Sequence, residues 1–137
     1  MISFSELWKE LKSKMELDAA TQRRTSREKF GIIIIPTVTG DKRMSLDCLN
    51  YIDIEQRSLC YHLLDENLKA RHVLRTSFHK AIEGLLGNNH LLFLRPSLLI
   101  NVDNVEFLTK DHMIFINGDV LYYPKKNYLE IYEKWNK

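Results

Sequence analysis

Apolar residues recur with two different periods along the chain, and the period changes near residue 30. In the first segment they fall three or four positions apart, which places them on one face of an α-helix. Those residues are Leu7, Trp8, Leu11, Met15 and Leu17. Beyond residue 30, short β-branched and apolar runs alternate with polar turns, as is typical of β-strands. The pattern therefore predicts an N-terminal helical extension or linker over residues 1–30 and a mostly β domain over residues 31–137.

The second period predicts about ten short strands. The expected strands cover residues 31–35, 43–46, 49–54, 59–64, 68–75, 91–94, 98–100, 105–108, 113–116 and 119–123. Pro36 is expected to end the first strand. Asn117 and Gly118 are expected to form a type I′ hairpin turn, whose two central residues both need positive φ.

Two short helices complete the expected elements. One covers residues 78–86, with Thr76 or Ser77 as its N-cap and Gly87 at its end. The other follows Pro124, where aromatic and apolar residues again take helical spacing.

The composition fits a single folded domain. The chain has 137 residues, of which 45% are hydrophobic and 28% charged, so it is too apolar to be disordered and too short to include a fused sensor domain. The longest purely apolar run, residues 32–35, is far below the roughly 20 residues that cross a bilayer. No export signal follows Met1. We therefore expect a cytoplasmic protein without membrane contact, in which Cys48 and Cys60 are reduced thiols.

Candidate catalytic chemistry is sparse. The histidines lie at positions 62, 72, 79, 90 and 112, without the short spacings that put two ligands on one metal ion, and neither cysteine belongs to a Cys-x-x-Cys pair. The sequence has no glycine-rich phosphate loop and no Gly-x-Ser-x-Gly elbow. We expect neither an enzyme nor a bound metal or cofactor.

Basic residues at strand boundaries are the most distinctive chemical feature. They are Arg57, Arg95, Lys110, Lys125 and Lys126. The net charge of +2 neither indicates nor excludes a nucleic-acid partner, so the placement of the charges has to decide. Arg can donate two hydrogen bonds to guanine or to a phosphate, and Lys supplies a mobile charge. Spacing alone favours an ordinary solvated surface over a binding site, because Lys and Arg are mostly exposed in any protein.

A known family accounts for the order of these elements. Residues 91–105 and the later hairpin resemble a LytTR-type DNA-binding domain, whose motif ends in Ser, two hydrophobic residues, Asn and a further hydrophobic residue. The matching residues are Ser97, Leu99, Ile100, Asn101 and Val105. Residues 49–53 and 78–86 resemble the family's acidic strand and its single helix. In all, the resemblance covers residues 31–135.

The resemblance implies an elongated, mostly β domain of small antiparallel sheets whose loops enter successive major grooves of duplex DNA. Such domains bind direct repeats and regulate transcription. The family's base-contacting positions fall here at Arg57 or Ser58, Arg95 or Pro96, and Lys125 or Lys126, and Lys110 lies before the final hairpin. Ser97 and Asn101 could contact phosphates or could bond the backbone, and both roles are open.

Departures from the family pattern fall at the reading positions. Phe93 stands in place of the motif's Arg, Arg95 in place of its His, and Lys125 in place of the Arg of a late Ser-Arg pair. Because Arg95 can still bond guanine, we expect a sequence-specific, duplex-DNA-binding transcription regulator without a receiver domain. The alternative is a LytTR-like interaction module that antagonises a related regulator without reading DNA itself.

The apolar face of the N-terminal segment has two open roles. Leu7, Trp8, Leu11 and Met15 could form a contact with a second copy of the chain or a regulatory protein. They could equally pack on the chain's own β domain.

If this face forms the dimer contact, a chain that begins at Thr25 should lose the oligomeric state of the full-length protein. Light scattering after size exclusion measures that state. An unchanged state in the shortened chain would show that the helix is not the dimer contact.

Overall fold

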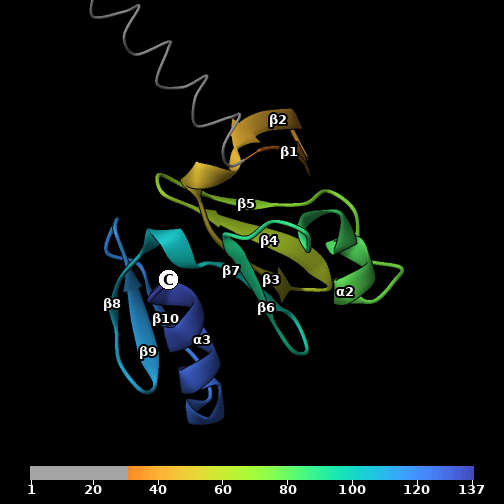
Figure 1. The fold of residues 1–137 in the computed structure, drawn as a ribbon. Helices are drawn as coiled ribbons and strands as arrows, with labels where there is room; N and C mark the ends of the chain where they lie inside the picture. The colour runs from red at the N-terminus through yellow and green to blue at the C-terminus, as the bar shows by residue number, and fades with distance from the viewer. Residues whose placement is uncertain (1–30) are drawn as a thin grey trace, which may run out of the picture.

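The structure, a computed structural model, describes residues 31–137. These residues form ten β-strands with a few short helical segments, which confirms the expected mostly β arrangement (Figure 1). None of the described helices is long and apolar enough to cross a membrane. The helix predicted for the N-terminal segment, with Leu7, Trp8, Leu11 and Met15, lies outside the described residues.

The strands form three antiparallel sheets. The first pairs β1 (Ile32–Thr37) with β2 (Gly40–Ser45). The second has the order β5 (Asn67–Lys69), β4 (Ser58–Leu63), β3 (Leu49–Glu55), β7 (Leu98–Asn101) and β6 (Leu91–Leu94). The third has the order β10 (Val120–Tyr122), β9 (His112–Phe115) and β8 (Val105–Leu108).

Short helical segments connect the sheets. The 3₁₀ segments are η1 (Leu46–Cys48), η2 (Glu83–Leu85), η3 (Val102–Asn104) and η4 (Lys125–Asn127), and the α-helices are α2 (Phe78–Ala81) and α3 (Tyr128–Trp135). The predicted cap of α2 is present, since the Ser77 hydroxyl accepts a hydrogen bond from the Lys80 N–H. The helix predicted over residues 78–86 is therefore a short α-helix followed by a 3₁₀ turn.

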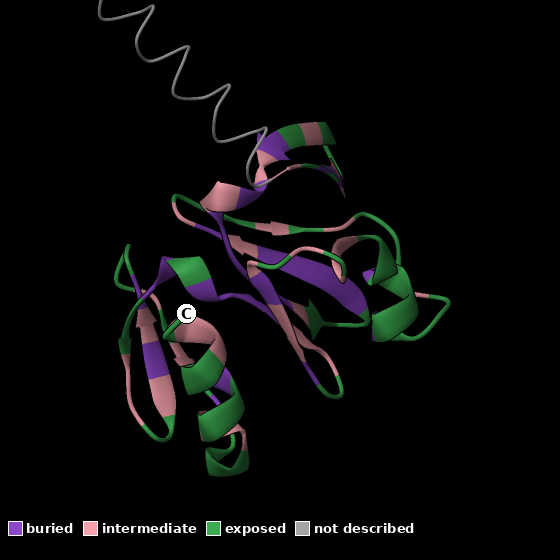
Figure 2. Cartoon of the chain, viewed as in Figure 1, coloured by how far each residue is buried: buried purple, intermediate pink, exposed green. Residues whose placement is uncertain are grey.

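The five-stranded sheet buries a separate apolar core on each face, because neighbouring residues of a strand point to opposite sides. On β3, Ile52 belongs to the core shared with β1, β2 and α2, while Tyr51 belongs to the core shared with the three-stranded sheet and α3. Leu99 and Ile100 of β7 divide in the same way. Figure 2 shows how strongly burial is concentrated in this sheet. It is the central layer of the domain.

Two strand boundaries differ from the sequence prediction. β1 continues through Pro36, which pairs with Asp41 of β2, because within the described residues β1 has only β2 as a partner and an edge strand tolerates a missing N–H. The strand expected over residues 68–75 ends at Lys69. Beyond it the backbone N–H groups of Ala70, Arg71 and Leu74 bond to carbonyls on different elements, so no single ladder continues.

The hairpin predicted at Asn117 and Gly118 is present, but its turn is not type I′. Gly118 has a φ of 94°, whereas Asn117 is not among the described residues with positive φ. The Gly118 N–H donates to Phe115 O and the Phe115 N–H donates to Asp119 O, each at 2.8 Å, as in a three-residue loop with a glycine bulge. The Asn117 side chain is instead engaged in tertiary contacts.

Buried asparagine side chains join the three sheets. Asn101 Nδ2 donates to the carbonyls of Leu46, 3.2 Å away, and Leu49, 3.0 Å away. Asn104 Nδ2 donates to the carbonyls of Asp47 and Leu49, each at 2.9 Å. These bonds connect η3 and the end of β7 to η1 and the start of β3, the segment that leaves the first sheet.

The same network reaches the β9–β10 hairpin. Asn50 Nδ2 donates to Asn117 Oδ1 at 3.1 Å, and Asn117 Nδ2 donates to the Leu64 carbonyl at 2.9 Å. No buried side-chain nitrogen or oxygen within residues 31–137 lacks a partner. We name Asn50, Asn101, Asn104 and Asn117 the asparagine junction.

Replacing Asn101 by Ala should lower the free energy of unfolding by about 3 kcal/mol. The substitution removes two donated bonds and one accepted from the Asp103 N–H, each contributing about 1 kcal/mol. Urea unfolding measures the change, with the exposed Asn89→Ala as the matched control. Equal stability of the two variants would contradict a structural role for Asn101.

Candidate nucleic-acid interface

The five candidate cations lie in loops that join or follow strands of two sheets. Arg57 lies in the β3–β4 turn and Arg95 in the β6–β7 turn, both on the five-stranded sheet. Lys110 lies in the β8–β9 loop, while Lys125 and Lys126 begin η4. In Figure 1 the β6–β7 turn, the β8–β9 loop and the start of α3 all lie on the lower side of the molecule. Three segments that are far apart in the sequence therefore lie on one side of the fold, while the β3–β4 turn with Arg57 lies beside the segment before α2.

The β3–β4 turn holds Arg57 in a strained backbone conformation. Glu55 pairs with Ser58, so Gln56 and Arg57 form a two-residue loop, with φ values of 52° and 68°. These positive φ values define the type I′ geometry, and non-glycine residues adopt it at a cost of about 1 kcal/mol each. The Leu74 N–H donates to the Arg57 carbonyl at 2.8 Å and fixes the turn to the segment before α2. The Arg57 side chain is exposed.

Arg95 lies at the mouth of an open pocket of about 360 Å³. The pocket is lined by Ser77, His79, Phe93, Arg95 and Pro96. The His79 ring meets the Phe93 ring edge-on, with the ring centroids 5.2 Å apart. A guanidinium, an imidazole and an aromatic face together can accept a base edge or a phosphate.

His79 and Ser77 are members of this site that sequence reasoning missed. The signal was available, because a cap at Ser77 places His79 in the first turn of α2. What the sequence does not show is that α2 packs beside β6, since that contact joins residues far apart in the chain. Phe93, which departs from the family motif, makes the contact by stacking on Phe78 with a centroid separation of 6.1 Å.

One carboxylate, Asp111, lies in the β8–β9 loop next to Lys110 and is influenced by Lys125. Asp111 Oδ1 lies 2.7 Å from His112 Nδ1 and 3.1 Å from Thr109 Oγ1. These two hydrogen bonds, with a smaller contribution from the positive charge of Lys125, lower the pKa of Asp111 below its ordinary value. The Tyr123 N–H donates to the Asp111 carbonyl at 3.0 Å, so the loop that carries Lys110 is fixed to the strand that leads into η4.

Two candidate residues are buried and cannot present a side chain to DNA. Ser58 has 4% of its surface exposed, and Asn101 has 1%. Of the two roles open for Asn101, the structure shows the backbone-bonding one. Ser97 is half-buried in the turn that holds the exposed Arg95.

The five strand-boundary cations differ from other cations of the domain in their pairing. Within residues 31–137, Arg57, Arg95, Lys110, Lys125 and Lys126 form no ion pair. Cations elsewhere do pair: Lys42 with Glu66, Arg71 with Asp41 and Lys80 with Glu83. The net charge of this part of the chain is zero, because it has as many Lys and Arg as Asp and Glu. The five cations are therefore unpaired because of where they lie, and not because this part of the chain has an excess of positive charge.

Comparison with known proteins identifies the fold. A solved structure of the LytTr DNA-binding domain of a protein described as a methyl-accepting/DNA response regulator from Bacillus cereus matches with a TM-score of 0.59 and 14% sequence identity. The match covers 77% of this chain and 95% of that chain. No protein-family model and no curated protein matches. Residues 31–137 thus have a LytTR-like fold, as the sequence motif predicted.

Replacing Arg57 by Gly should raise the free energy of unfolding by about 1 kcal/mol, because glycine adopts positive φ without steric cost. The matched control is Arg95→Gly, which removes the same side chain from a turn position without positive φ. Urea unfolding compares the two variants. If both lower stability equally, the β3–β4 turn is not strained.

Proposed function

We propose that this chain binds duplex DNA in a sequence-specific manner and regulates transcription. The observation that supports the proposal most strongly is the set of unpaired cations on turns of two sheets in a LytTR-like fold. Phosphate neutralisation supplies much of the affinity of such proteins for DNA, and it requires cations that are not already paired with carboxylates. A DNA-binding role explains why these five cations form no ion pair within residues 31–137.

The turns take different roles in the proposed complex. Arg57 and Arg95 lie at the tips of two-stranded turns, which can enter a major groove, and either guanidinium can form two bonds with a guanine. Lys110, Lys125 and Lys126 lie on the other sheet and bind phosphates along an adjacent part of the duplex. Two sheets placed side by side would then occupy successive major grooves.

The proposal extends to the operator and to regulation. The proposed operator is a direct repeat with one copy of the chain on each half-site, as the resemblance to LytTR-type domains implies. Control through a dimer or a partner protein bound by the N-terminal segment, and a cytoplasmic location, belong to the same proposal.

A second candidate function is the interaction module that antagonises a related regulator. A row of apolar side chains crosses the outer face of the three-stranded sheet, where Phe107 and Val120 both pair with Ile114. Phe107 and Val120 are exposed. Exposed apolar patches are typical of protein contacts, so this face would hold the partner if the chain does not read DNA.

Fluorescence anisotropy with a duplex selected from a random pool should distinguish the two functions. A specific regulator binds the selected duplex about 10³-fold or more tightly than random DNA, and log affinity falls linearly with log salt concentration. Arg95→Ala should reduce the preference at one base by about 1–3 kcal/mol. Lys126→Gln should weaken all duplexes alike and reduce the salt slope by about 0.9.

Arg43→Gln is the matched control, because Arg43 is an exposed cation on β2 of the first sheet. It should bind as the unchanged chain does. If the chain binds no duplex, the interaction module is favoured. If Arg43→Gln weakens binding as much as Lys126→Gln does, the proposed interface is wrong.

A further inference from the structure

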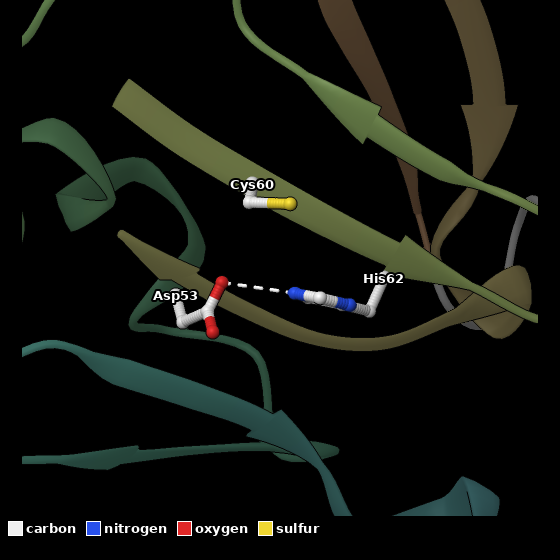
Figure 3. Close-up of side chains that lie close together, drawn as sticks. All are labelled: Asp53, Cys60 and His62. Carbon is white, nitrogen blue, oxygen red and sulfur yellow. Dashed lines mark hydrogen bonds and ion pairs between the residues drawn. The ribbon is translucent and has the colours of Figure 1, made fainter. Parts of the chain in front are cut away.

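Three side chains with metal-ligating atoms lie together on one face of the central sheet. Asp53 of β3 and Cys60 of β4 are directly opposite each other in the strand register, and His62 lies two residues beyond Cys60 on the same face. Figure 3 shows the three side chains converging between the two strands. One ligand atom from each, a carboxylate oxygen, a thiol sulfur and an imidazole nitrogen, lies within 4.8 Å of the others.

Packing holds these side chains in place. His62 Nε2 lies 2.9 Å from Asp53 Oδ1, and the His62 ring stacks on Tyr51 with a centroid separation of 4.0 Å and an interplanar angle of 11°. Cys60 is 4% exposed, while the side chains of His62 and Asp53 are 15% and 36% exposed. The group is therefore anchored on its inner side and open to solvent on its outer side.

We propose that Asp53, Cys60 and His62 form a binding site for a divalent transition-metal ion, with Zn²⁺ the best match. Zinc accepts sulfur, nitrogen and oxygen ligands together, at about 2.3 Å from sulfur and about 2.0–2.2 Å from nitrogen and oxygen. Tetrahedral ligands at those distances are about 3–4 Å apart, so the three groups need only small side-chain rotations. Three protein ligands leave a fourth position, on the exposed side, for water.

The charge balance of the site favours a cation. Burial is the largest cause of the raised pKa of the Cys60 thiol, and the carboxylates of Asp53 and Glu55 both lie close enough to Cys60 to raise it further. On binding, the metal–sulfur bond forms and the thiol proton passes to solvent, while His62 gives up its hydrogen bond with Asp53, binds the metal through Nε2 and carries its ring hydrogen on Nδ1. Glu55 adds negative charge nearby and Lys69 opposes it.

The sequence contained part of this signal. Cys60 and His62 are separated by one residue, which places both side chains on the same face of a strand. This spacing differs from that of the common Cys-x-x-Cys motifs, so a motif search does not find it. Asp53 joins them only through the pairing of β3 with β4. Neither the DNA-binding turns nor the proposed transcriptional role is needed for this inference.

Cobalt titration of the full-length chain tests the site, because Co²⁺ takes the place of Zn²⁺ and absorbs light when bound to a thiolate. We expect one equivalent of Co²⁺ to give a thiolate charge-transfer band and the visible bands of tetrahedral cobalt, and Zn²⁺ to displace it. Cys60→Ser should abolish the charge-transfer band. Cys48→Ser, which removes the other cysteine, should retain it.

His62→Gln and Asp53→Asn should each weaken Co²⁺ binding by at least about tenfold, since each removes a ligand. Circular dichroism establishes that each variant is folded before its titration is compared. Absence of a thiolate band in the unchanged chain would overturn the proposal. So would a band that survives Cys60→Ser or disappears in Cys48→Ser.

Discussion

The arrangement of this domain depends on the hydrogen bonds of its asparagine junction. A buried amide without partners costs about 1–3 kcal/mol, so Asn101 and Asn104 can remain buried only while η1 and η3 stay within bonding distance of each other. Asn50, which is also buried, extends this condition to the β9–β10 hairpin through its bond to the exposed Asn117. Polar contacts of this kind are directional, whereas apolar packing alone tolerates sliding. The junction therefore fixes the position of the three-stranded sheet relative to the central sheet.

That fixed relation is what a nucleic-acid interface on this chain requires. Arg57 and Arg95 belong to the central sheet, whereas Lys110 and Lys125 belong to the three-stranded sheet. Two groups of cations can match the regular spacing of phosphates only if the distance between them is constant. The strain at Arg57 is consistent with this requirement, because strained residues are retained where their position has a use. The metal site proposed for Asp53, Cys60 and His62 lies in the same hairpin as Arg57.

Features decided by nearby residues were predictable from the sequence, and features decided by packing were not. Strand alternation and the Ser77 cap depend on short spacing, and both are present in the structure. The type I′ turn was expected at Asn117 and Gly118 but occurs at Gln56 and Arg57, because tertiary bonds use the Asn117 side chain. The role of Asn101, the contact of His79 with Phe93 and the convergence of Asp53 on His62 all join distant segments. The cation positions came from sequence, while the placement of the β6–β7 turn, the β8–β9 loop and the start of α3 on one side came from the fold.

The most direct test of a two-sheet DNA interface is nuclear magnetic resonance of the ¹⁵N-labelled chain, titrated with a duplex selected from a random pool. We expect amide shifts to change together at residues 56, 57, 95, 97, 109–111 and 125–127, and to stay unchanged in β2 and in the hairpin at residues 117–118. Changes confined to one sheet, or centred on β2 or that hairpin, would contradict the interface.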